Sequence, residues 1–309
     1  MPFSADPAPD STSYKTGYFV INSSSGTTVT ETLRLRNDSD APIRLRIQSV
    51  DATTGPYGGI SYGLPAEPVK NVGTWTSLPA SEIDLAPRET KNVPLTVTVP
   101  PTASVGDHIG GIAVWLPRAE NAGEPGAGGQ SAVIDTQMRR VLSVHVVVPG
   151  PAEPLIVITD VKPVVRPDGV YLEILISNQG RRLTRGDGFI ELTGNDFHRD
   201  FALDTFVPGT SIAYPIKWMD NPEENTYPNH ILIQYDQFTA EWWGSFAVGS
   251  GLKAQEAERE GASGNSRYLF AGLLAAVLAL IGLFTVLYLR KRRREEEKRL
   301  PPTISGSPL

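Results

Sequence analysis

The sequence predicts an all-β protein with two tandem β-sandwich domains, followed by a single transmembrane helix. Three observations support this prediction. Apolar and polar residues alternate over many short runs, which is typical of strands that bury one face. Clusters of Asn, Asp, Gly and Pro separate the runs, as expected for turns. Residues 268–289 contain no charged side chain, and basic residues follow them directly.

The first predicted sandwich covers residues 14–149. Apolar residues occupy every second position of residues 43–47, with arginines between them, and the same period recurs in residues 95–99. The Asn-Asp-Ser-Asp sequence at residues 37–40 predicts a turn between two strands. Pro100 then ends a strand, because proline cannot donate a hydrogen bond to the ladder.

Two insertions make this domain longer than a minimal sandwich. Residues 56–74 are rich in Gly and Pro, and we expect them to form an irregular loop. Residues 117–132 join the strands predicted at 109–116 and 133–148. They contain almost no apolar side chain to bury, so we expect a mobile hairpin loop there.

The second predicted sandwich covers residues 154–248 and begins after a Pro-Gly-Pro sequence. Its seven runs are expected at residues 155–158, 171–176, 189–192, 201–203, 212–216, 231–235 and 242–248. Seven strands within a domain of about 100 residues are typical of an immunoglobulin-like (Ig-like) fold. Turns are expected at 166–169, 178–180 and 207–209.

The C-terminal part predicts a membrane anchor. Residues 249–267 have the composition of a flexible tether. At about 1.5 Å per residue, a helix over 268–289 would span about 33 Å, enough to cross a hydrocarbon core of about 30 Å. The basic residues 290–294 predict that 290–309 form a cytoplasmic tail, because Lys and Arg beside a span resist translocation. The prediction is a single-pass protein of the cell membrane with both sandwiches outside the cell.

Charge and composition agree with this topology and exclude several function classes. The net charge of the chain is −6, and residues 290–309 hold seven Lys/Arg and three Glu, or +4, so the remainder carries −10. An acidic exterior offers no footprint for nucleic acid. The absence of cysteine excludes disulfides and thiolate chemistry. Residues 1–13 lack the basic and apolar regions of an export signal, so we expect that the natural chain starts earlier.

The sequence indicates a protein that is not an enzyme. It contains none of the hydrolase, zinc-protease or nucleotide-binding motifs that carry a recognisable mechanism. Asp51 or Asp107 could pair with Glu82 in a glycosidase, but surface-turn acids are far commoner than catalytic pairs. His198 and Asp200 form only a short match to a metal site. We therefore predict no catalytic residue, no metal and no cofactor.

Two features favour a binding site in the first domain. Gly110 and Gly111 lie inside a predicted strand, where glycine weakens packing. A β-bulge would explain them, and so would a ligand that approaches the bare backbone beside Asp107 and His108.

Aromatic residues in or beside the irregular loop are the second feature. Tyr57, Tyr62 and Trp75 are expected to expose ring faces that stack on sugars or anchor a partner protein. Trp115 and one of Trp242 and Trp243 are instead expected in the cores.

Several motifs occur in one order along the first domain: Asn-Asp-Ser at 37–39, Asp-Ala-Thr-Thr-Gly at 51–55, Leu-Ala-Pro at 85–87, and Gly-Asp-His-Ile-Gly-Gly at 106–111. In this order the chain resembles the WxL-interacting proteins of Gram-positive bacteria. The resemblance covers about residues 14–149 and implies an Ig-like peptidoglycan-binding domain, a second Ig-like domain and a C-terminal transmembrane anchor. The second domain, implicated in partner binding in that family, matches here only as a sandwich.

The predicted function is therefore that of a membrane-anchored surface protein that binds cell-wall peptidoglycan or another wall glycan. The predicted contact residues are Tyr57, Tyr62, Trp75, Asp107, His108, Gly110 and Gly111. The alternatives are a scaffold that binds other surface proteins and an accessory subunit of a membrane assembly. A cleft with Tyr62 beside Trp75 would favour the glycan, and an exposed strand edge with few charges would favour a protein partner.

Overall fold

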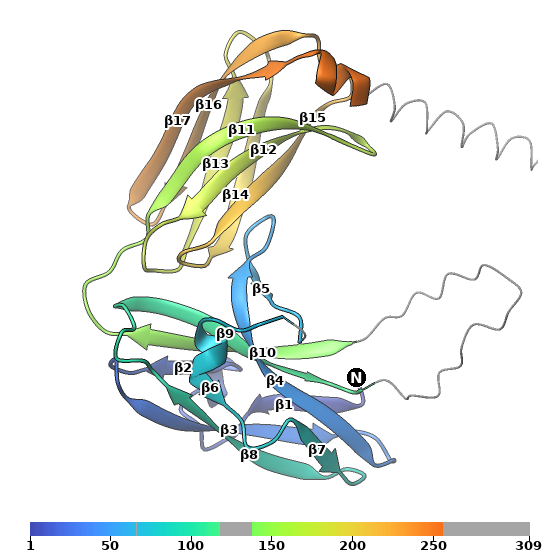
Figure 1. The fold of residues 1–309 in the computed structure, drawn as a ribbon, viewed down its shortest axis with the longest axis vertical. Coiled ribbons are helices and arrows are strands. Elements are labelled where there is room, and N and C mark those ends of the chain that lie inside the picture. Colours follow the sequence, from blue (N-terminus) through green and yellow to red (C-terminus); the bar gives the residue numbers. More distant parts are fainter. Residues whose placement is uncertain (66, 118–137, 256–309) are drawn as a thin grey trace, which may run out of the picture.

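The structure is a computed structural model, and it describes residues 1–65, 67–117 and 138–255. Two β-sandwiches follow each other along the chain (Figure 1), which confirms the all-β fold. Most of the predicted loop at 117–132, the predicted span at 268–289 and the tail at 290–309 lie outside the described residues. Within the described ranges, no helix has the length and apolar character needed to cross a membrane.

The first sandwich consists of a four-stranded and a six-stranded sheet. The four-stranded sheet has the order β1 (Phe3–Pro7), β3 (Thr28–Asn37), β8 (Thr90–Thr98) and β6 (Thr76–Ser77). The other sheet has the order β2 (Phe19–Asn22), β10 (Arg139–Val148), β9 (Gly106–Trp115), β4 (Ile43–Thr54) and β5 (Ile60–Tyr62), with β7 (Glu82–Leu85) also paired to β4. Because β1 pairs with β3, the sandwich begins before residue 14.

The second sandwich has a three-stranded and a four-stranded sheet. The first has the order β11 (Ile156–Arg166), β12 (Gly169–Asn178) and β15 (Ser211–Met219). The second has the order β14 (His198–Phe206), β13 (Thr184–Leu192), β16 (Asn225–Tyr235) and β17 (Phe238–Val248). Each of the seven predicted runs overlaps one of these strands. Residues 250–255 are helical, and Leu252 packs against the core, so the predicted tether at 249–267 is wrong for its described part.

Alternation along the strands builds the two cores. Leu33 and Leu35 on β3 and Leu45 on β4 are fully buried in the first sandwich. Leu172 and Ile174 on β12 are fully buried in the second. Each such side chain stabilises the fold by about 1.5–3 kcal/mol relative to an exposed position. Trp115 is buried, but it lies in a small cluster with Val50 and Ala113 and not in the main core as predicted. Trp242 packs against the second core, as predicted for one of the pair, and Trp243 is 64% exposed.

The two sandwiches share one strand order. The sheet β1-β3-β8 corresponds to β11-β12-β15, and β7-β4-β9-β10 corresponds to β14-β13-β16-β17. The first sandwich adds β2, which pairs parallel to β10. It also adds an insertion between β4 and β7, residues 55–81, which contains β5, α1 (Val72–Trp75) and β6. A short 3-10 helix, η1 (Tyr14–Thr16), precedes β2.

A buried asparagine occupies the same place in both sandwiches. Asn37 and Asn178 end the corresponding strands β3 and β12 and are 0% and 1% exposed. Each side-chain carbonyl accepts the backbone N–H two residues ahead, at 2.9 Å and 3.0 Å. Each side-chain amide donates to the carbonyl four residues ahead and to a carbonyl of a distant loop, that of Ala86 or Phe206. The asparagines therefore fix the predicted turns at 37–40 and 178–180.

Candidate functional site at the domain junction

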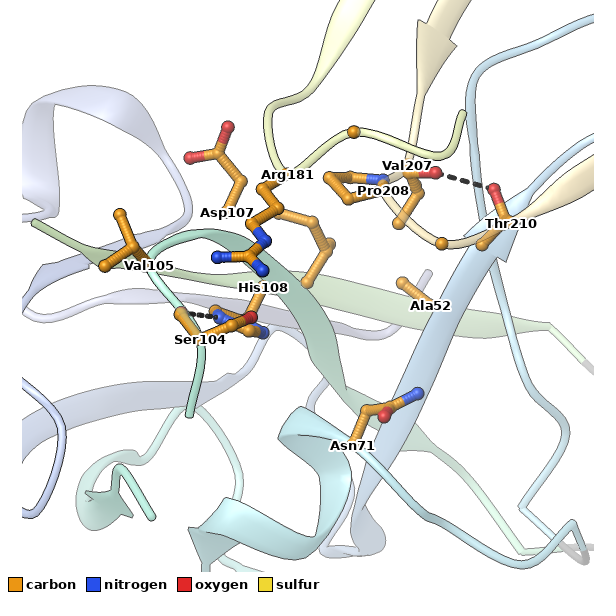
Figure 2. Close-up of a pocket in the computed structure, with 13 residues that line it drawn as sticks. Ala52, Asn71, Ser104, Val105, Asp107, His108, Arg181, Val207, Pro208 and Thr210 are labelled. Atoms are coloured by element: carbon orange, nitrogen blue, oxygen red, sulfur yellow. Dashed lines mark hydrogen bonds between the residues drawn. The ribbon is translucent and has the colours of Figure 1, made fainter. Parts of the chain in front are cut away.

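A cleft of about 260 Å³ lies between the two sandwiches (Figure 2). Three segments of the first sandwich and two loops of the second form its walls. The lining residues are Ala52, Asn71, Ser104, Val105, Asp107, His108, Ile109, Gly180, Arg181, Val207, Pro208, Gly209 and Thr210. Two of the predicted contact residues, Asp107 and His108, therefore line this cleft.

Asp107 connects the sandwiches. Its side chain is 9% exposed, and its carboxylate lies 3.0 Å from His145 Nε2 and accepts hydrogen bonds from Arg182 Nη1 at 3.2 Å and the Leu183 N–H at 2.8 Å. Its own backbone N–H donates to the Arg181 carbonyl at 2.8 Å. Burial raises the pKa of the Asp107 carboxyl, but the hydrogen bonds from His145 and Leu183, with the electrostatic interactions with His145 and Arg182, outweigh burial and lower it. Asp107 is thus a structural contact between the domains.

His108 faces the cleft from β9 and is held from two sides. Its Nε2 lies 2.7 Å from the Ser104 carbonyl, within the loop before the strand. Its ring packs on Trp75, with centroids 4.8 Å apart and planes inclined by 52°. Trp75 thus lies behind His108 and packs against the first core. Both contacts come from the first sandwich, so they fix the orientation of the imidazole within that domain.

The floor of the cleft is held by a turn of the insertion. The Asp51 carboxylate accepts hydrogen bonds from the backbone N–H groups of Asn71 at 3.0 Å and Gly73 at 2.8 Å. A carboxylate at this position satisfies the free donors at the start of α1. The Asn71 side chain itself is exposed, so its amide is available at the cleft.

Arg181 supplies a positive charge to the cleft. Its backbone is fixed, since its N–H donates to the Glu153 carbonyl at 2.8 Å. Its side chain is exposed, and within the described residues its guanidinium has neither an ion pair nor a hydrogen bond. Figure 2 shows the guanidinium directed toward His108 and Ser104. A planar guanidinium without a partner is suited to a carboxylate or phosphate group, which it can bind through two parallel hydrogen bonds.

Gly110 and Gly111 are explained by contacts within the chain. The pairing of β9 with β4 and β10 is regular across both residues, so there is no bulge. A Cβ on Gly110 would lie 2.8 Å from Val72 Cβ, and one on Gly111 would lie 2.9 Å from the Tyr62 ring. The space beside both glycines is therefore occupied by side chains of the insertion.

The predicted aromatic residues do not form one surface. Successive residues of a strand face opposite sides of a sheet, so Tyr62 over Gly111 and α1 over Gly110 lie on opposite faces. Trp75 packs with the first core, whereas Tyr62 packs with Trp115 on the outer face. Burial raises the pKa of the Tyr62 hydroxyl. The arrangement expected for a glycan cleft, with Tyr62 beside Trp75, is therefore not found.

Tyr57 lies at the tip of the β4–β5 turn, which reaches the second sandwich (Figure 1). Its ring meets Tyr214 edge-on, with centroids 5.5 Å apart, and the residue is 56% exposed. At the base of the turn, the Thr54 hydroxyl accepts a hydrogen bond from the Val207 N–H at 2.9 Å and lies 2.6 Å from the Thr210 hydroxyl. Tyr57 therefore belongs to the junction between the domains.

The sequence analysis did not identify the cleft residues Asn71, Ser104, Arg181 and Thr210. Each is an ordinary polar residue of a turn, and no spacing in the sequence connects those of the first domain with those of the second. Nothing in the geometry of the described residues indicates a metal centre, because no group of three or more His, Asp or Glu is arranged to hold an ion. That the protein is not an enzyme stays a prediction from the sequence motifs.

Comparison with known proteins identifies the first sandwich. Residues 4–115 match the family described as WxL Interacting Protein, peptidoglycan binding domain. The match spans β1 to β9, so it includes the insertion and the first-domain wall of the cleft. It confirms the resemblance inferred from the ordered motifs. No curated protein matches the chain.

Solved structures resemble the chain at low similarity. A chaperone–tip adhesin complex of CFA/I fimbriae matches with a TM-score of 0.40 and 10% identity, over 79% of this chain and 98% of that chain. The class 5 fimbriae chaperone CfaA matches with a TM-score of 0.36 and 10% identity, over 80% and 100%. The Csu pili complex of Acinetobacter baumannii matches with a TM-score of 0.35 and 12% identity, over 64% and 87%. Similarity at this level does not indicate what the chain binds.

Proposed function

Because residues 4–115 carry the peptidoglycan-binding domain of the WxL-interacting protein family, we propose that the chain is a membrane-anchored surface protein that binds peptidoglycan, or another wall glycan, through its first domain. The family match is the observation that supports this function. The proposed topology follows the sequence: two extracellular sandwiches, a span at 268–289 and a cytoplasmic tail at 290–309.

The junction cleft is the proposed contact site for the wall polymer. Peptidoglycan peptides carry carboxylates, and Arg181 offers a guanidinium without a described partner. His108 and Asn71 provide further hydrogen-bonding groups on the opposite wall. In this arrangement the first domain supplies neutral hydrogen-bonding groups and the second domain supplies the positive charge. Such a charged hydrogen bond contributes about 1.5–3 kcal/mol, or about 10- to 150-fold in affinity.

The experiment is sedimentation of the purified chain with insoluble peptidoglycan stripped of teichoic polymers. We expect the wild type to sediment with the wall material and Arg181→Ala to bind at least about tenfold more weakly. Arg44→Ala is the matched control, since Arg44 is exposed on β4 of the first sandwich and pairs with Asp84 away from the cleft.

Two results would contradict the proposals separately. A wild-type chain that stays in the supernatant argues against wall binding. If the wild type and Arg181→Ala sediment equally, wall binding stands and the cleft is not the contact site.

A further inference from the structure

The outer face of the four-stranded sheet in the second sandwich carries aromatic and acidic side chains. The strand register places Glu191, His230 and Trp243 side by side on β13, β16 and β17. The adjacent row holds Phe189 and Leu232, together with Asp200 and Glu241. Side chains two positions apart on a strand share a face, so both rows point away from the core. We call this set the outer platform.

Trp243 has an open ring face in a fixed orientation. Its ring lies parallel to the His230 ring, with centroids 3.7 Å apart and planes inclined by 9°. Its Nε1 donates a hydrogen bond to Glu241 at 3.1 Å. One face of the indole is therefore covered while the residue as a whole is 64% exposed. A large aromatic side chain held in place but left open to solvent is typical of a binding surface.

The platform is acidic, and the described residues do not neutralise it. Glu191 and Glu241 flank His230 at 3.1 Å and 2.9 Å, and Asp200 lies 3.2 Å from His198. No lysine or arginine in the described ranges pairs with Asp187, Glu191, Asp200 or Glu241. The face is therefore complementary to a positively charged group, which can also lie over the tryptophan ring.

A depression of about 520 Å³ continues the platform from the row of Phe189 and Leu232. Its lining comprises Asp187, Gly188, Phe189, Asp200, Phe201, Ala202, Leu232 and Gln234. Apolar side chains lie next to carboxylate and amide groups, so the depression can receive a ring that has one apolar face and polar edges. Its volume falls within the range of small-ligand sites in proteins.

We propose that the outer platform binds a glycan that carries protonated amino sugars. A sugar ring stacks on the open face of Trp243, its ammonium group meets the carboxylates, and a second ring occupies the depression. An extended peptide that pairs with this sheet would add at its edge strands β14 or β17, because β13 and β16 are interior strands whose backbone groups are already paired on both sides. It would therefore not lie across the centre of the platform. This site lies in the second sandwich and goes beyond the proposed wall-binding function of the first.

The test is calorimetric titration of the full chain in detergent with a hexamer of glucosamine and, in parallel, a hexamer of N-acetylglucosamine. We expect the wild type to bind the glucosamine hexamer at least about tenfold more tightly, because only that hexamer carries ammonium groups. Trp243→Ala should weaken its binding by about tenfold or more. Asp187→Asn with Asp200→Asn should reduce the preference over the acetylated hexamer.

The control variants are Tyr14→Ala, since Tyr14 is an exposed aromatic of the first sandwich, and Arg181→Ala. Both should bind the glucosamine hexamer like the wild type, which separates this site from the junction cleft. Retained circular dichroism and thermal midpoint would show that Trp243→Ala folds.

Three outcomes of the hexamer titrations would overturn the proposal. They are no binding of the glucosamine hexamer, unchanged binding by a folded Trp243→Ala, and equal binding of the two hexamers. Tighter binding of an oligolysine of equal charge would assign the platform to a basic protein segment and would likewise overturn it.

Discussion

The two sandwiches have the same seven-strand order and the same buried asparagine, yet they present different surfaces. In the first, the insertion covers the outer face of the larger sheet: Arg139 donates to the Gly63 carbonyl, Gln48 donates to the Pro65 carbonyl, and Trp115 beneath is 8% exposed. In the second, the corresponding face is bare and Trp243 is 64% exposed. The shared framework provides stability, while the binding features come from an insertion in one domain and an uncovered face in the other.

The largest expected effect is the loss of stability when either buried asparagine is replaced, and it tests whether the two residues play the same role. Asn37→Ala removes five side-chain hydrogen bonds and Asn178→Ala removes four, and both leave buried carbonyls unpaired. The three bonds that the two residues share are worth about 1 kcal/mol each, so each variant should destabilise its own domain by at least about 3 kcal/mol. Calorimetry should show a lowered transition for the first domain in one variant and for the second domain in the other.

Asn92→Ala is the control for this pair, because Asn92 is exposed on β8. Its expected effect is within about 0.5 kcal/mol. If either buried variant loses no more stability than this control, the prediction fails for that domain. Water would then replace the lost hydrogen bonds of that asparagine.

The second prediction concerns the insertion that only the first sandwich has. Gly110→Ala places a Cβ 2.8 Å from Val72 Cβ and 2.9 Å from the Val50 carbonyl oxygen, which cannot move freely in a paired strand. We expect a loss of about 1–3 kcal/mol in the first domain, measured by chemical denaturation. Gly249→Ala has open space around its Cβ and should change stability little. Equal stability of the two variants would show that α1 is not packed on β9 as described.

The smallest predicted effect concerns the contact between the sandwiches. Asp107→Asn removes the charge that meets His145 and Arg182 and should cost about 1–2 kcal/mol at neutral pH. The pKa of Asp107 is lowered in the folded protein, so its stabilisation is present above the ordinary value of 3.8. It is lost as the pH falls through the lowered folded value.

The measurement for this third prediction is the difference in thermal midpoint between the wild type and Asp107→Asn as a function of pH. The difference should be constant near neutral pH and shrink below pH 3.8. A difference that stays constant down to the most acidic condition would show that the carboxylate charge does not hold the junction.

Much of the fold could be predicted from the sequence, because each strand carries its own signal. The alternation at residues 43–47 and the turn residues at 178–180 require no knowledge of distant partners. These features are local, and the structure confirms them.

The site could not be predicted in the same way, because its contacts are long-range. Asp107 meets Arg182 75 residues further along the chain, and nothing near Asp107 indicates that partner. Tyr62 and Trp75 are close in sequence, but the chain passes around the sheet between them and places them on opposite faces. Arg181 has no motif around it and is important only because of where the junction places it.

The parallel pair of β2 and β10 has a mechanical consequence. A pull that enters at the start of β2 and leaves at the end of β10, toward the second sandwich, draws the two strands in opposite directions along their length. The four residue pairs from Val144–Phe19 to Val147–Asn22 then bear the load together, in shear. An antiparallel hairpin pulled at its open end would separate one pair at a time. The β2–β10 pair therefore resists a stretch applied between the start of β2 and the end of β10 more strongly than an antiparallel pair of the same length.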